Sequence, residues 1–189
     1  MTSVDRMPPL DAAAMTPEQR QAADALAAGP RGGVKGPFVP LLRSPELMDR
    51  LQKVGEYLRF RSSLPPRISE FLMLVVSRQW TQQFEWAVHE PLALKAGLKR
   101  ETVSALRHGR RPAGMPRDEE AAYEFCDELA RTRGVSDDTY RRALEEFGER
   151  GVIDMLGVIG YFTTVCMVMN VAHTPPPDAG AAALASFPL

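Results

Sequence analysis

The feature that most limits the possible folds is a long stretch without a charged residue, from Met155 to Ala172. A stretch of this length is either a membrane span or a helix that must be buried against protein. It contains Gly157, Gly160 and Asn170, it follows Asp154 directly, and no second stretch of this kind accompanies it. We therefore interpret it as a helix buried in the core or at a subunit interface, and we expect no membrane partner.

The composition is that of a globular protein with a sizeable core. Hydrophobic residues make up 44% of the 189 residues, and 23 basic and 24 acidic residues leave a net charge of −1. This balance offers no basic surface to attract nucleic acid. The only cysteines are Cys126 and Cys166, and the first residues do not resemble a signal peptide. We expect a cytoplasmic, reducing environment and no disulfide.

Helix start and stop signals divide the chain. Thr16-Pro17-Glu18 and Ser44-Pro45-Glu46 each place an N-cap residue before a proline and an acid, the order that begins a helix. No segment combines strand periodicity with hairpin turns, so the expected fold class is all-α. The expected helices cover residues 17–29, a segment from 45 that ends before the prolines at 65 and 66, then 67–80, 82–96, 100–108, 118–134, 136–148 and 149–172.

The expected organisation is a single helical domain over residues 16–175, between a flexible N-terminus at 1–15 and a disordered tail at 176–189. Within it, residues 29–40 contain four glycines and three prolines, which exclude regular structure. This segment is either a surface connection or the rim of a pocket that carries Arg31 and Lys35.

One group of polar residues has the spacing of an acid/base site. Gln82, Glu85 and His89 share one face of the expected helix 82–96, and Glu70 lies on the preceding helix. Glu85 and His89 are four residues apart, close enough for the carboxylate to hold the imidazole. In apolar surroundings such a pair transfers protons near neutral pH, whereas on a surface it is only a weak ion pair. Spacing alone leaves both interpretations open.

The same residues resemble the core motif of the carboxymuconolactone decarboxylase-like superfamily, which includes the alkyl hydroperoxidase D-like proteins. In its peroxidase branch the pattern is Glu, eleven residues, Cys, two residues, Cys, three residues, His. This chain has Glu70, Gln82, Glu85 and His89 at those spacings. The resemblance implies an all-α fold built from a degenerate helix-pair repeat, with a core motif at 66–110 and a second repeat at 118–174. It also implies a homo-oligomer, either a trimer or a hexamer.

The replaced cysteines decide which chemistry the resemblance implies. Peroxidases of this branch need one thiolate to attack and a second thiol to resolve the product. Gln82 and Glu85 provide neither, so a peroxidase of this type would have lost its thiol activity. The decarboxylase branch also has a Glu, three residues and a His, but its members are shorter. They lack a counterpart of Glu70 and carry a basic residue where this chain has Glu90 and Pro91.

The function expected from this resemblance is a cofactor-free lyase that acts on a small carboxylated lactone or carbonyl acid. His89 would donate a proton or act as an electrophile, Glu85 would orient it, and Glu70 would relay protons. The alternative is a non-catalytic oligomeric binding protein. No residues have the spacing of metal ligands. The candidate substrate-binding residues are Gln82, Arg78, Trp86, Arg31 and Lys35.

Overall fold

The computed structural model describes residues 4–177 and 184–185, and every regular element within them is an α-helix. The all-α prediction is therefore confirmed for the described chain. The helices are α1 (Pro17–Ala28), α2 (Phe38–Leu41), α3 (Pro45–Phe60), α4 (Pro66–Gln79), α5 (Gln83–Lys95), α6 (Arg100–Arg107), α7 (Arg117–Thr132) and α8 (Asp137–Ala172).

The helix ends follow the local signals in the sequence. Thr16 forms a capping box with Gln19 at the start of α1, and the Ser136 hydroxyl accepts the Thr139 N–H at the start of α8. Gly148 has φ 67° and ψ 173°, a conformation that only glycine adopts readily, and it breaks α8 where a helix boundary was expected. The chain then continues in helix, so α8 contains both of the helices expected after Ser136.

The structure corrects two expectations outside the main helices. Residues 29–40 were expected to be irregular, but Phe38–Leu41 forms the short helix α2 and buries Phe38 and Leu41. Residues 176–189 were expected to be disordered, yet Leu184 is buried and its backbone exchanges hydrogen bonds with the side chain of Gln83. Residues 178–183 and 186–189 lie outside the described residues. Near the N-terminus, the Arg6 N–H donates to the Ala172 carbonyl.

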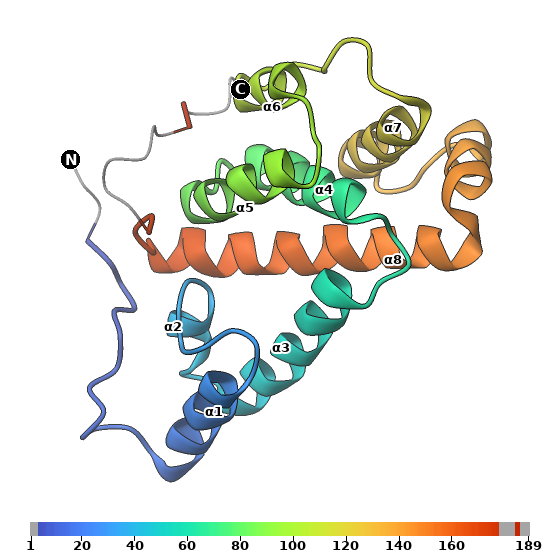
Figure 1. The fold of residues 1–189 in the computed structure, drawn as a ribbon. Helices are drawn as coiled ribbons and strands as arrows, with labels where there is room; N and C mark the ends of the chain where they lie inside the picture. The colour runs from blue at the N-terminus through green and yellow to red at the C-terminus, as the bar shows by residue number, and fades with distance from the viewer. Residues whose placement is uncertain (1–3, 178–183, 186–189) are drawn as a thin grey trace.

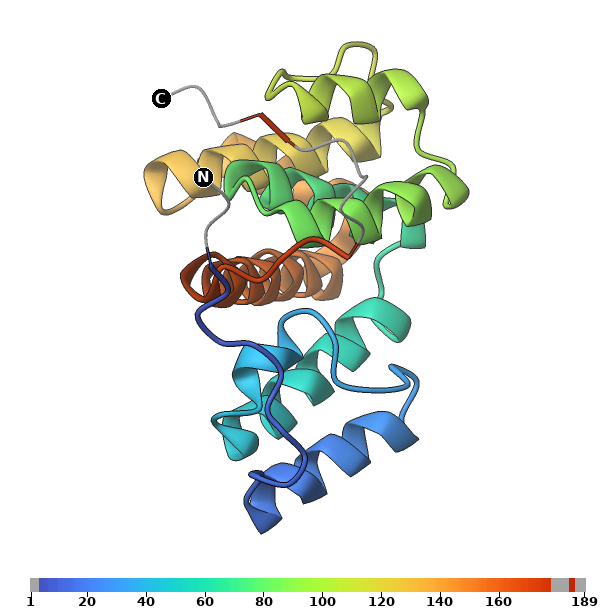
Figure 2. The same ribbon diagram turned by 90° about the vertical axis from the view of Figure 1, so that its left-hand side faces the viewer.

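Helix α8 lies between two groups of helices, with α4 to α7 on one side and α1 to α3 on the other (Figure 1; Figure 2). It contacts α4 and α7 across one face and α2 and α3 across another. The core is centred on α4, where the residues from Phe71 to Val76 are all buried. This arrangement brings α3, α5 and α8 together around one space.

The uncharged stretch in α8 is only partly covered. By length and composition α8 is the one helix in the described chain that would suit a membrane span, and half of its most apolar part is buried. Ile153, Leu156, Met167 and Val171 share its other face and are exposed, Ile153 by 65% and Val171 by 59%. The expectation of burial thus holds for one face, and an apolar stripe remains on the opposite one.

Candidate active site

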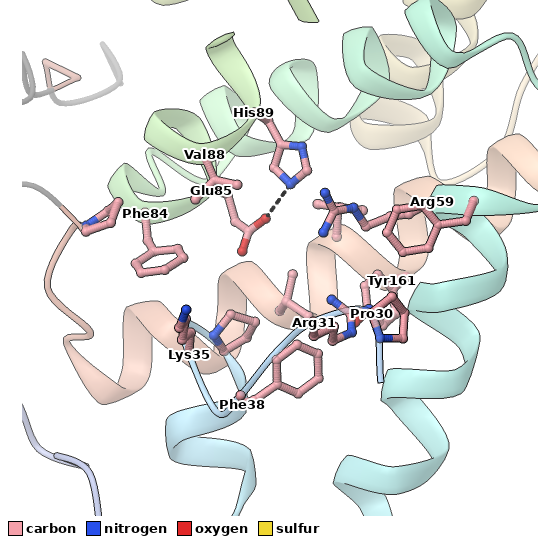
Figure 3. A pocket seen from close by; sticks show the side chains of 16 residues that line it. Pro30, Arg31, Lys35, Phe38, Arg59, Phe84, Glu85, Val88, His89 and Tyr161 are labelled. Atoms are coloured by element: carbon pink, nitrogen blue, oxygen red, sulfur yellow. Dashed lines mark ion pairs between the residues drawn. The ribbon is translucent and has the colours of Figure 1, made fainter. Parts of the chain in front are cut away.

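A cavity of about 390 Å³ opens where α3, α5 and α8 meet the segment that precedes α2. Figure 3 shows Glu85 and His89 of α5 on one side and Arg31, Phe38 and Tyr161 on the other. Its volume suits a small organic ligand. The segment 29–37 is therefore part of a pocket wall, which decides between the two interpretations of the Gly/Pro-rich segment.

The turn between α4 and α5 orients the acid/base residues. Thr81 has a positive φ of 46°, and Gln82 then caps α5 by accepting hydrogen bonds from the N–H groups of Phe84 and Glu85. The Gln82 amide also donates to Asn170 on α8. Gln82 therefore fixes the first turn of α5, which carries Glu85, and does not line the cavity.

Glu70, Glu85 and His89 converge as their spacing predicts. His89 is 2% exposed, and its Nδ1 lies 2.7 Å from Oε2 of Glu70 while its Nε2 lies 3.2 Å from Oε2 of Glu85. The edge of its ring meets Phe162 of α8, with centroids 5.1 Å apart. Glu85 and His89 both line the cavity (Figure 3), whereas Glu70 is not among the lining residues and pairs with Nδ1 of the imidazole. Glu85 and His89 thus face the cavity, and Glu70 supports His89 through its other ring nitrogen.

The two carboxylates control the charge of His89. Burial by itself lowers the pKa of His89, but hydrogen bonds and ion pairs with Glu70 and Glu85 outweigh burial and raise the pKa above its usual 6.5. The two carboxylates therefore favour the imidazolium form, in which each ring N–H donates to one carboxylate. Such a chain holds a transferable proton next to the cavity.

The raised pKa predicts how stability depends on pH. The folded state holds the His89 proton more tightly than the unfolded state, so this stabilisation is complete below pH 6.5 and is lost as pH rises through the higher folded-state pKa. As pH rises from about 6.5 through the folded-state pKa, we expect the free energy of unfolding to fall more steeply for the parent than for His89→Gln, by up to about 1.4 kcal/mol per pH unit. Urea denaturation across this range measures the two slopes, and parallel curves would contradict the prediction.

The candidate substrate-binding residues divide into two groups. Arg31 and Lys35 line the cavity, as proposed. The structure does not bring Gln82, Trp86 or Arg78 to it. The indole N–H of Trp86 donates to Glu90 at 3.0 Å, and Arg78 donates to the carbonyl of Ala185 at 2.7 Å.

Sequence reasoning missed two polar residues of the cavity, Arg59 at the end of α3 and Tyr161 in α8. A signal for Tyr161 was present, because it is the one tyrosine in the uncharged stretch from Met155 to Ala172. Arg59 had no such signal, since arginine is common near the C-terminus of a helix.

The second repeat does not form a second site. Asp154 and His173 match the spacing of Glu70 and His89, but Asp154 lies within α8 and His173 caps the C-terminus of the same helix, roughly 28 Å further along its axis. Asp154 instead accepts hydrogen bonds from Tyr57 and from the backbone and hydroxyl of Ser63, and so anchors the α3–α4 connection.

The cysteines do not supply thiol chemistry to the cavity. Both are buried, and neither lines the space beside Glu85. Burial raises the pKa of Cys126 to about 12, and burial likewise raises the pKa of Cys166. A thiolate is therefore disfavoured at both positions.

Comparisons with known proteins agree with this picture. Residues 45–128, from α3 into α7, match the sequence model of the Carboxymuconolactone decarboxylase family. A solved structure described as an alkylhydroperoxidase AhpD core, an uncharacterized peroxidase-related protein from Ralstonia eutropha JMP134, superposes with a TM-score of 0.73 at 16% identity, over 92% of each chain. No curated protein matches the sequence. Residues 45–128 thus carry the sequence of the carboxymuconolactone decarboxylase family, without the cysteine pair of its peroxidase branch, on an alkylhydroperoxidase-like helical fold.

Proposed function

We propose that this protein is an acid/base lyase that decarboxylates a small carboxylated lactone or carbonyl acid and requires no cofactor for that step. The observation that carries the proposal is the proton chain Glu85–His89–Glu70 at the wall of a small cavity that also contains arginine side chains. An anion binds to the arginines, and its reacting carbon faces the carboxylate. Residues 45–128 match the Carboxymuconolactone decarboxylase family model, and the presence of Gln82 and Glu85 in place of the cysteine pair favours a lyase over a thiol peroxidase.

The order of the three residues suggests a division of roles. Glu85 and His89 both line the cavity, and Glu85 is the only one of the two carboxylates that does so. We assign direct proton exchange with substrate to Glu85, with His89 as the neighbouring source of the proton. His89 supplies the proton to Glu85 through Nε2, and Glu70 holds the imidazole through Nδ1. Glu85 also occupies the position of the second cysteine in the peroxidase pattern. The residue that contacts substrate in this variant is then a carboxylate in place of a thiolate.

The proposed reaction breaks one C–C bond and adds one proton to the carbon that loses carbon dioxide. Loss of carbon dioxide leaves the electron pair of the broken C–C bond on the α-carbon, delocalised onto the adjacent carbonyl. Protonation of that carbon by the Glu85–His89 pair completes the reaction.

A direct assay tests the proposal. Purified protein is incubated with a panel of carboxylated γ-lactones and β-keto acids, and carbon dioxide release is followed with a coupled carboxylase assay while proton NMR records the product. We expect at least one compound to release carbon dioxide in the parent and not in Glu85→Gln. If no compound reacts although several bind, the protein is a binding protein and the lyase proposal is wrong.

We also propose a homo-oligomer built through the exposed face of α8. Ile153, Leu156, Met167 and Val171 form an apolar stripe of the kind that subunit interfaces cover. Sedimentation should give a trimer or hexamer of the 20.9 kDa chain, and Ile153→Lys should dissociate it. A monomeric parent would contradict this proposal without affecting the active site.

A further inference from the structure

Arg31 is placed in the cavity wall with part of its charge unpaired. Its Nε and Nη2 are buried, and no group in the described residues accepts a hydrogen bond from either. The guanidinium lies over the ring of Phe38, with Cζ 4.5 Å from the centroid, and burial lowers the pKa of Arg31. A buried cation without an acceptor is costly, and native proteins rarely retain one without a partner or ligand.

A second arginine faces the same space. Arg59 lines the cavity, and its Nε is also buried without an acceptor in the described chain. Among the described residues, the only carboxylate that lines this cavity is that of Glu85, which is already paired with His89 (Figure 3). The cavity thus has one wall rich in unsatisfied donors and one wall with a proton-transferring carboxylate.

The backbone is adapted to hold Arg31 in this position. Gly55 is buried in the middle of α3, where glycine costs about 1 kcal/mol relative to alanine. A Cβ at Gly55 would collide with the hydroxyl of Tyr161 and would lie 2.7 Å from Nη2 of Arg31. The absent side chain therefore provides the space that the phenol and the guanidinium share.

The segment that carries Arg31 is itself fixed against the active-site helix. Gly36 has a φ of 56°, and a Cβ there would lie 2.6 Å from Cε1 of Phe84 on α5. Close contact of the backbone with this ring holds the segment 30–38 as the wall opposite Glu85.

From this geometry we propose that Arg31, Arg59 and Tyr161 form a carboxylate-binding subsite, with Gly55 as the residue that makes room for it. The inference rests on the proposed function for the identity of the reaction, but the subsite is a statement about binding alone. A substrate carboxylate accepts hydrogen bonds from Nε and Nη2 of Arg31, the fork geometry that suits a bidentate pair. Its remaining atoms then extend across the cavity toward Glu85. The ligand class is a small organic anion with a carboxylate one small ring away from its reacting centre.

The test measures binding without turnover. Dissociation constants are determined by calorimetry or ligand-observed NMR for 5-oxotetrahydrofuran-2-carboxylate, benzoate and glutarate, and for the methyl ester of the lactone acid. We expect at least one acid to bind and the uncharged ester to bind at least about 10-fold more weakly than its acid. Arg31→Gln should weaken binding of the acid by about 10- to 100-fold, the effect of losing a charge-assisted hydrogen bond. Arg110→Gln, which removes an exposed arginine outside the cavity, serves as the charge-matched control and should bind like the parent.

Gly55→Ala provides a second variant that should stay folded. Its Cβ meets the end of the Arg31 side chain and the phenol of the buried Tyr161, so the variant displaces these two groups, while alanine itself favours the helix. We expect weaker binding of the acid, and thermal denaturation checks that the variant remains folded. Binding of the ester should change less, because the ester does not depend on the displaced guanidinium.

The outcomes separate the subsite from the proposed reaction. If none of the three acids binds, if acid and ester bind equally, or if Arg31→Gln retains the parent's affinity, the subsite is wrong. If binding depends on Arg31 but no carboxylated compound releases carbon dioxide, the subsite proposal is supported and the lyase proposal is wrong.

Discussion

Replacing Glu85 with glutamine is expected to lower kcat/KM for the decarboxylated substrate by about 10²–10⁴-fold, the usual contribution of a general acid or base. Glu85 lines the cavity beside His89 and pairs with its Nε2, so the proposed route takes a proton from His89 to the substrate through the Glu85 carboxylate. Glutamine has nearly the same size and accepts the same hydrogen bond from Nε2 of His89, but it cannot exchange a proton. The loss should therefore appear mainly in kcat.

The control for this variant is Glu101→Gln, which neutralises an exposed glutamate in the first turn of α6. It should retain the parent's kinetics. A Glu85→Gln enzyme with a normal kcat would show that Glu85 only orients the histidine. From the sequence we expected Glu85 to have this lesser role, and its position at the cavity is the reason for assigning it the larger one.

Replacing His89 with alanine is expected to reduce turnover by a similar factor and also to destabilise the fold. Without the imidazolium, the carboxylates of Glu70 and Glu85 lose the cation between them, and removing one partner of a buried ion pair typically costs about 3–5 kcal/mol. Thermal denaturation measures the stability loss, and kcat is measured well below the melting temperature of the variant.

His89→Gln separates catalysis from stability at this position. Its amide can donate to one carboxylate, so it should unfold at a higher temperature than His89→Ala while remaining as inactive. Activity near the parent's level in a folded His89→Gln protein would mean that the three residues form a structural ion pair and not a proton chain.

The elements that could be predicted from sequence are those that depend on short-range spacing. Thr16 and Ser136 cap helices because a capping side chain reaches only two or three residues along its own chain. Glu85 and His89 meet because four residues make about one helical turn. The proximity of Glu70 to His89 could be predicted only from the family resemblance, because it depends on how α4 packs against α5.

Two of the residues assigned to substrate binding lie away from the cavity for a different reason. Trp86 and Gln82 have polar groups on the same helix as Glu85, so proximity in sequence suggested a common role. In the structure the indole N–H pairs with Glu90 and the amide pairs with Asn170. Each of these groups is hydrogen-bonded to a neighbouring side chain, and neither of them lines the cavity.

The sequence by itself determined the helical class, most helix ends and the pairing of Glu85 with His89, because each follows from contacts within a few residues. Only the tertiary structure decided which cations face that pair. Arg31, Arg59 and Tyr161 come from a loop, from α3 and from α8, and they meet around Gly55 because α8 packs between the two groups of helices. Contacts of that kind depend on the relative placement of whole helices, which no local pattern of residues encodes.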